Sequence, residues 1–256
     1  MTAAREPKQI TVKSPEEIAL MRKAGAIVAE MLEETRRAAK PGLTTNDLDA
    51  VAEDVLMRRG AQSAFKGYYG YPKVICVSIN DELVHGIPGN RVIKDGDLMS
   101  VDAGAVWQGW YGDAAITFPV GDVSDEAKKL IEVTRMALEV GIATARPGVR
   151  LGAVSHAIQA YIEGHGFGVV QEYVGHGIGR QMHEPPSVPN FGPADRGIIL
   201  RKGLCIAIEP MVTVGDWHTK VHRDGWTVST VDGSLCAHFE HSMALVDGGV
   251  EVLTLP

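Results

Sequence analysis

Cysteine is scarce in this chain, and the three that occur are Cys76, Cys205 and Cys236. Their number is odd and each lies in an apolar, strand-like segment, which is typical of reduced, buried thiols rather than of a disulfide framework. They also lack the close spacing of a zinc knuckle. These features favour a cytoplasmic protein.

A basic excess and long apolar runs are absent as well. The formal net charge is −7 and no basic stripe is visible, so nucleic acid is not expected as the main ligand. No apolar run has membrane-spanning length. The amino terminus, MTAAREPKQI, has no apolar core of a secretory signal. We therefore expect no membrane partner.

What the sequence does contain is a set of residues suited to binding metal. In chain order they are Asp102, Asp113, His176, Glu209 and Glu240. Four carboxylates in one pocket repel each other and need cations to remain ionised. Hard oxygen donors with one nitrogen suit a pair of divalent ions, and two such ions can share a water and lower its pKa. This set predicts a metal-dependent hydrolase.

The two aspartates lie on a predicted hairpin. A strand is expected over 98–105 and a returning strand over 111–120, with a turn at 108–109. A hairpin of this length can place Asp102 and Asp113 side by side on neighbouring strands.

The other three candidates also have settings that suit ligands. His176 lies in GHGIG, where small neighbours allow backbone and ligand to approach closely. Glu209 ends the apolar run LCIAI before Pro210, and Glu240 ends the short strand CAHF. Taken singly, such residues are more often turn formers, solvated acids or structural histidines. An acid in an apolar strand is costly to bury unless it is paired or metal-bound, so the joint pattern favours a metal site.

An internal repeat organises the chain. Residues 39–60 (AKPGLTTNDLDAVAEDVLMRRG) match residues 145–166 (ARPGVRLGAVSHAIQAYIEGHG) at a constant offset. Each segment reads as a Pro-Gly turn and then an amphipathic helix closed by glycine. Each follows a longer helix, expected to begin near Ser14 and near Ser124. Chance similarity of two turns is the poorer explanation, because the closing glycines and the order of elements also match.

The repeat continues beyond the helices. Each half supplies a His-Gly-Ile turn, around His85 and His176, and then a strand that ends in an acid. Two helix pairs and two curved antiparallel sheets, related by a pseudo-two-fold axis, would bring these acids together at the centre. We predict an α+β protein. The predicted divisions are an amino-terminal tail at 1–13 and one catalytic domain at 14–256, with halves at about 14–120 and 121–256.

Taken together, these motifs resemble the type I methionine aminopeptidases. They are HGIPG at 85–89, SVDAG at 100–104, GD at 112–113, GHGIGRQMHEPP at 175–186, IEP at 208–210 and FEH at 239–241. The resemblance extends roughly from Ser14 to Leu253, and the motifs are specific as an ordered set. It implies the pita-bread fold, which is built from an internal repeat. It also implies removal of the initiator methionine from nascent proteins when the second residue is small, by attack of a metal-bridging hydroxide.

The resemblance further implies roles for individual residues. The five ligands would hold two divalent ions, Co, Mn, Fe or Zn, with Asp113 and Glu240 bridging them. His85 would contact the amine-side nitrogen of the substrate, and His183 would donate a hydrogen bond to the scissile carbonyl oxygen. Glu209 would be both a ligand and the acceptor of the proton from the water.

An apolar methionine pocket follows from the same resemblance. Its expected residues are Phe65, Tyr68, Tyr71, Cys76, Met182 and Trp226. Ordinary core packing is the alternative explanation for the aromatic residues. The chain departs from the common type I pattern at Phe65, Ala103-Gly104, Met182, Ala207 and His238. These departures leave the reaction type intact and bear on metal preference.

The type II branch of the family is excluded by length, and two other interpretations compete with this one. Type II enzymes carry a large insertion in the catalytic domain. The segment between His183 and Glu209 is too short to contain it. A prolidase or aminopeptidase P shares the five ligands but usually has an additional amino-terminal domain. A non-enzymatic relative that binds ribosomes or RNA would have lost ligands that are all present here. We expect a monomer whose partners are nascent polypeptides with amino-terminal methionine, and the ribosome exit region is a candidate contact.

Overall fold

The helices begin where local capping signals predict. The computed structural model describes residues 9–256, so residues 1–8 of the predicted tail lie outside the described part. Helix α1 (Pro15–Ala38) starts after Ser14, which exchanges capping hydrogen bonds with Glu17. Helix α3 (Asp125–Thr144) starts after Ser124, whose hydroxyl accepts a hydrogen bond from the first turn. Both predicted starts are confirmed.

The repeated segments form the two shorter helices. Helix α2 (Thr45–Arg59) ends at Gly60, which has φ 62 in the left-handed region that glycine adopts readily. Helix α4 (Leu151–Gly164) ends slightly before the predicted glycine, and Gly166 provides the left-handed turn two residues later. Within residues 9–256, no helix combines the length and hydrophobicity needed to cross a membrane.

The strands are mostly short, apart from one long hairpin. In chain order they are β1 (Gln62–Ser63), β2 (Ile75–Ile79), β3 (Glu82–Val84), β4 (Leu98–Trp107), β5 (Trp110–Pro119), β6 (Gly168–Val169), β7 (Gly175–Gly177), β8 (Glu184–Val188), β9 (Cys205–Ile208), β10 (Met211–Thr213), β11 (Thr219–Val221), β12 (Val228–Thr230), β13 (Cys236–His238), β14 (Glu240–Val246) and β15 (Gly249–Val252). A 3₁₀ turn, η1 (Tyr68–Gly70), lies between β1 and β2.

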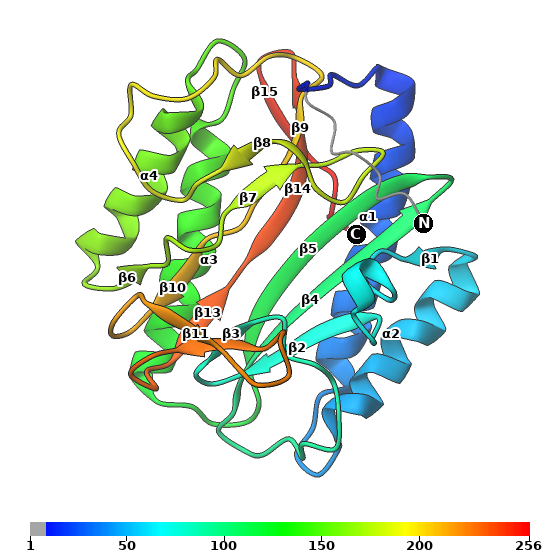
Figure 1. The fold of residues 1–256 in the computed structure, drawn as a ribbon, viewed down its shortest axis with the longest axis vertical. Coiled ribbons are helices and arrows are strands. Elements are labelled where there is room, and N and C mark those ends of the chain that lie inside the picture. Colours follow the sequence, from blue (N-terminus) through cyan, green and yellow to red (C-terminus); the bar gives the residue numbers. More distant parts are fainter. Residues whose placement is uncertain (1–8) are drawn as a thin grey trace.

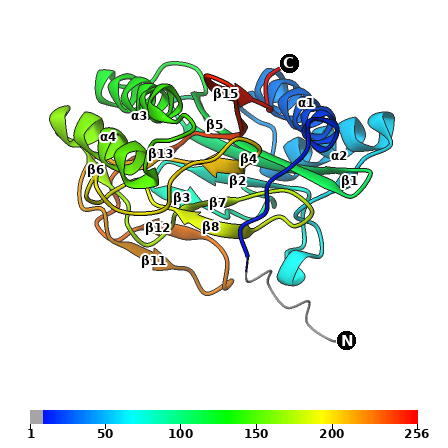
Figure 2. The same cartoon turned by 90° about the horizontal axis from the view of Figure 1, so that it is seen from above.

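The main sheet has the order β1-β4-β5-β14-β9-β7-β8, with β2 paired to β4 and β15 paired to β14. Two smaller sheets have the orders β13-β10-β6 and β11-β12-β3. The main sheet curves, and helices α1 to α4 lie along one side of it, with β11 towards the other side (Figures 1 and 2). One face of the sheet is therefore packed under helices, and the opposite, concave face is left to form a site.

The hairpin of β4 and β5 has the predicted turn. Gln108 and Gly109 have φ values of 50 and 77 and connect the paired residues Trp107 and Trp110. Two successive positive φ angles define the type I′ turn, whose twist matches the twist of a hairpin. The sequence predicted that Glu240 ends the short strand CAHF, and this placement is wrong. Strand β13 ends at His238, and Glu240 begins the next strand, β14.

Two apolar cores lie between the helices and the sheet. The first joins α1 and α2 to the sheet through residues such as Val28 and Leu48, and the second joins α3 and α4 through residues such as Leu130 and Ile158. Helix α1 approaches β5 very closely, since a Cβ atom on Gly112 would lie 2.8 Å from the backbone nitrogen of Gly25. This close packing holds rigid the part of β5 that carries the next residue, a predicted ligand.

Candidate active site

The register of the main sheet brings three predicted ligands onto one face. Asp102 on β4 pairs with Ala115 on β5, and Ala115 pairs with Glu240 on β14. Asp113 pairs with Gly104, two positions away from the Asp102 pair. Because residues two apart on a strand share a face, Asp102, Asp113 and Glu240 lie together. The two aspartates are diagonal rather than direct neighbours.

The two remaining ligands come from β7 and β9. His176 is the central residue of β7, and its Nε2 lies 3.6 Å from Asp113 Oδ2 and 3.7 Å from Glu209 Oε1. Glu209 directly follows β9, where Ile208 pairs with His241. Alternation along the strand therefore turns Glu209 to the face that holds Glu240.

The His176 ring is oriented as a metal-binding imidazole. Its Nδ1 lies 2.9 Å from the carbonyl oxygen of Gly177. A carbonyl only accepts hydrogen bonds, so Nδ1 carries the proton and the lone pair is on Nε2, facing the carboxylates. Burial lowers the pKa of His176 to about 4, which keeps the ring neutral. A lone pair that faces carboxylate oxygens is unfavourable unless a cation lies between them.

The carboxylates show the same need for a cation. Burial raises the pKa of Asp102, Asp113, Glu209 and Glu240, and neighbouring carboxylates raise it further for Asp102, Glu209 and Glu240. Within residues 9–256, Asp102 Oδ1, Asp113 Oδ1 and Glu240 Oε1 are buried without a hydrogen-bond partner. Buried polar atoms normally have partners. Ligand atoms of Asp113, His176 and Glu240 lie within 4.8 Å of one another, so the donor set fits divalent cations.

A cavity of about 320 Å³ lies against these residues. The sequence-predicted residues that line it are Phe65, Tyr68, Tyr71, Cys76, His85, Asp102, Asp113, His176, Met182, His183, Glu209, Trp226 and Glu240. Every candidate from the sequence therefore borders one cavity. Tyr69 also lines it, and sequence reasoning missed this residue although it lies between two residues that were chosen. Its φ of 46 gives it an unusual backbone conformation that no sequence pattern signalled.

The two further histidines lie beside the ligands. The Tyr68 hydroxyl is 2.8 Å from His183 Nδ1, and the rings of His183 and His176 have centroids 4.3 Å apart. His85 has a φ of 59, and its ring meets the ring of Trp226 edge-on at 6.5 Å. Burial lowers the pKa of His85 to about 4, with a further contribution from His183.

The apolar end of the cavity is a cluster of aromatic and sulfur-containing side chains. Phe65, Tyr71, Cys76 and Met182 are buried there, and Trp226 packs against them with its ring 5.0 Å from that of Tyr71. Sulfur and aromatic groups make favourable contacts that adapt to shape. The cluster therefore offers a pocket for a flexible apolar side chain.

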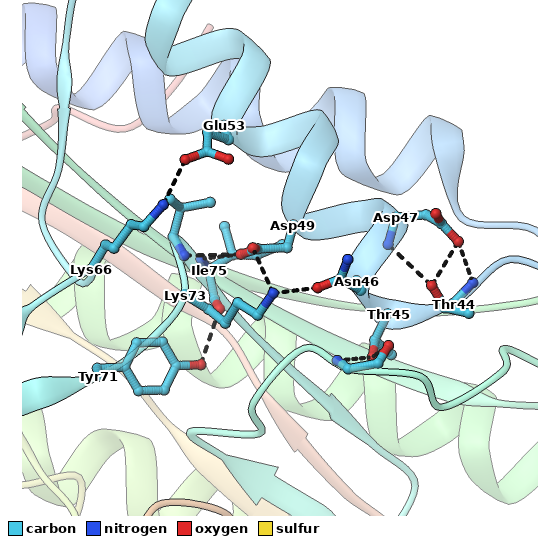
Figure 3. Close-up of polar contacts among 12 residues, drawn as sticks. Thr44, Thr45, Asn46, Asp47, Asp49, Glu53, Lys66, Tyr71, Lys73 and Ile75 are labelled. Carbon is cyan, nitrogen blue, oxygen red and sulfur yellow. Dashed lines mark hydrogen bonds and ion pairs between the residues drawn. The ribbon is translucent and has the colours of Figure 1, made fainter.

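Helix α2 fixes the segment that carries Tyr71 and Cys76. The carboxylate of Asp49 accepts hydrogen bonds from the backbone N–H groups of Val74 and Ile75 at 2.9 and 3.3 Å. The Tyr71 hydroxyl lies 3.0 Å from the carbonyl oxygen of Ile75 (Figure 3). Tertiary hydrogen bonds thus set the pocket wall.

One more histidine points into the centre. His238 Nε2 lies 3.9 Å from Glu209 Oε2 and 3.9 Å from Glu240 Oε2. From the sequence it was noted only as a departure from the common type I pattern. Its placement two residues before Glu240 is the signal that could have identified it.

The site has close counterparts among known proteins. The model of metallopeptidase family M24 matches residues 19–247. Methionine aminopeptidase 1 of Bacillus subtilis is 51% identical over 245 residues, which cover 96% of this chain and 99% of that protein. The crystal structure of methionine aminopeptidase from Thermotoga maritima has a TM-score of 0.96 and 49% identity, covering 97% of this chain and 100% of that one. Prolidase from Pyrococcus horikoshii has a TM-score of 0.77 at 24% identity and is covered over 63% of its length, which shows a shared fold alone.

Proposed function

The chain belongs to metallopeptidase family M24 and is a methionine aminopeptidase with the pita-bread fold, and we propose that its concave cavity is where amino-terminal methionine is removed. The supporting observation is the convergence of Asp102, Asp113, His176, Glu209 and Glu240 beside an apolar pocket. Unpartnered ligand atoms at one end and an apolar wall at the other suit a peptide whose first side chain is methionine.

We propose that the five ligands hold two divalent ions, among Co, Mn, Fe and Zn. When bound, such ions supply a water of lowered pKa and an electrophile for the scissile carbonyl. His176 would contribute Nε2, because its Nδ1 proton is donated to the carbonyl of Gly177. Asp113 and Glu240 would each contribute to both positions, since they lie between the remaining ligands on adjacent strands.

The remaining polar groups would act on the peptide. His183 would donate from Nε2 to the carbonyl oxygen, and the contact of its Nδ1 with the Tyr68 hydroxyl supports this tautomer. His85, which lines the same cavity, would contact the amine-side nitrogen of the substrate. Glu209 would accept the proton from the attacking water, and its position at the end of a rigid strand suits this role.

The pocket would set specificity. Phe65, Tyr68, Tyr71, Met182 and Trp226 would enclose one unbranched apolar side chain. The second residue of the peptide would lie at the crowded rim of the ligands, so peptides beginning Met-Ala, Met-Gly or Met-Ser should be cut and those beginning Met-Lys or Met-Glu cut poorly. We propose nascent polypeptides in the cytoplasm as the substrates of a monomeric, single-domain enzyme.

The direct test uses protein purified without added metal. Its metal content is measured, and cleavage of Met-Ala-Ser and of an Ala-Pro peptide is followed as each of the four ions is added. We expect cleavage of Met-Ala-Ser that depends on bound metal, with little cleavage of the Ala-Pro bond. Preference for the Ala-Pro peptide, or cleavage that is independent of metal, would overturn the proposal.

A further inference from the structure

His238 has an imidazole nitrogen with no obvious purpose in the five-ligand site. The residue is 2% exposed, and within residues 9–256 its Nε2 has no hydrogen-bond partner. Buried polar nitrogens are normally satisfied, and leaving one unpaired costs roughly 1–3 kcal/mol. The ring nevertheless points between two carboxylates, Glu209 and Glu240. A bound cation would satisfy this nitrogen and both carboxylates.

The backbone of His238 is held firmly in place. The Thr117 hydroxyl accepts a hydrogen bond from His238 N at 2.9 Å and donates one to His238 O at 2.8 Å. Ser100 Oγ lies 2.8 Å from Thr117 Oγ1 and supplies the remaining hydrogen bond to it. All three residues are buried. The imidazole is thus attached to a rigid support, as a metal-binding group requires.

We propose that His238 is a sixth protein ligand of the metal centre, binding through Nε2 the ion that it shares with Glu209 and Glu240. Ligand atoms of these three residues lie within 4.8 Å of one another. Metal–nitrogen and metal–oxygen bonds are each about 2.0–2.2 Å, so two ligands of one ion are at most about 4.0–4.4 Å apart. The observed separations of 3.9 Å fall inside that limit. This inference rests on the proposed function of the same cavity.

A second imidazole changes which ions the centre favours. Nitrogen ligands suit Zn, Co and Fe better than Mn, which is better matched to oxygen ligands. His176 alone gives one nitrogen among five protein ligands, whereas His176 and His238 together give two among six. The chain should therefore bind Co and Zn over Mn more selectively than a centre that lacks this histidine.

X-ray absorption of the cobalt-loaded full chain tests the inference without relying on activity. We expect scattering from two imidazoles per two-cobalt centre in the unchanged protein and from one in the His238→Gln variant. Competition with a chelator should show a loss of cobalt affinity of about 10-fold or more in the variant, in line with altered metal surroundings, and a smaller loss for manganese.

A matched control is His241→Gln. His241 is three residues further along, its alternation in β14 turns it to the other face of the sheet, and its Nδ1 contacts Thr254 Oγ1 at 2.8 Å. This variant should keep both the imidazole count and the cobalt affinity. One imidazole per centre in the unchanged protein, or an equal count in His238→Gln, would overturn the assignment and leave the five-ligand enzyme intact. Absence of metal uptake and of Met-Ala-Ser cleavage would instead overturn the proposed function.

Discussion

Lys13 Nζ lies 2.7 Å from Glu184 Oε2, and each side chain is only 4% exposed. The other carboxylate oxygen, Glu184 Oε1, accepts the backbone N–H groups of Arg180 and Gln181 at 2.7 and 3.1 Å. The chain segment before α1 thus holds the loop that carries His183. A buried ion pair of this kind ties the amino-terminal segment to the proposed active site.

We predict that Lys13→Met lowers both stability and turnover. Removing one partner leaves a buried carboxylate without its counter-charge, which costs about 3–5 kcal/mol, and it releases the loop near His183. Denaturant unfolding and steady-state cleavage of Met-Ala-Ser measure the two effects. The control is Lys128→Met, which removes an exposed partner of Asp125 and should cost at most about 1 kcal/mol. Equal losses in the two variants would contradict a special role for the buried pair.

The same ion pair predicts a pH dependence of stability. Burial raises the pKa of Glu184, but hydrogen bonds and charge from Lys13, with a hydrogen bond from Thr11, outweigh it and hold the pKa below its ordinary value of 4.5. The unfolded chain therefore takes up this proton first as the pH falls. The contribution of ionised Glu184 to the free energy of unfolding is complete above the pKa that Glu184 has in the unfolded chain. It is lost as the pH falls through the lower pKa that Glu184 has in the folded protein.

The Glu184→Gln variant checks this sign. It should lose stability near neutral pH, and its unfolding free energy should fall less steeply than that of the unchanged protein as the pH drops below 4.5. Acid titrations of the unfolding free energy give the comparison. If the unfolding free energies of the variant and the unchanged protein fell with the same slope at acid pH, Glu184 would not have a lowered pKa.

Asp113→Ala should abolish activity and lower metal occupancy. The residue lies between the other ligands, with His176 Nε2 3.6 Å from its Oδ2, so its loss would affect both metal positions. Metal analysis and cleavage of Met-Ala-Ser at saturating metal are the measurements. Asp113→Asn keeps the shape and removes the charge, and should also lose metal. Turnover close to normal in either variant would exclude Asp113 as a ligand.

His85→Ala and His183→Ala should each reduce turnover by about 10²-fold or more, as expected when a group that stabilises developing charge or handles a proton is lost. Their metal content should stay close to that of the unchanged protein. His156→Ala on α4 is the control and should have normal turnover. A variant that folds but lacks metal would show instead that its histidine is a ligand.

Phe65 and Gly104 are predicted to depend on each other. A Cβ atom on Gly104 would lie 2.7 Å from Phe65 Cε1, so the large ring occupies space that a side chain at position 104 would need. Gly104→Thr alone should lower stability and the kcat/KM for Met-Ala-Ser. Combining it with Phe65→Cys should restore part of both, with a coupling of about 0.5–3 kcal/mol. Additive losses in the double variant would show that the two positions are independent.

Features that depend on a few neighbouring residues could be predicted from the sequence. The starts of α1 and α3 follow from the capping residues Ser14 and Ser124. The turn at Gln108 and Gly109 follows from local turn chemistry. The candidate ligands were found because acids are rarely placed in apolar strands without a partner.

Features that depend on packing between distant segments were decided only by the tertiary structure. Nothing near Lys13 in the sequence signals burial, because its partner Glu184 is far away along the chain. The position of Glu240 at the start of β14, rather than at the end of the preceding strand, depends on its pairing with Ala115. His238 likewise faces the carboxylates only because β13 and β14 bring it there. Local propensities act over a few residues, whereas strand register and the pairing of buried charges are settled by the whole fold.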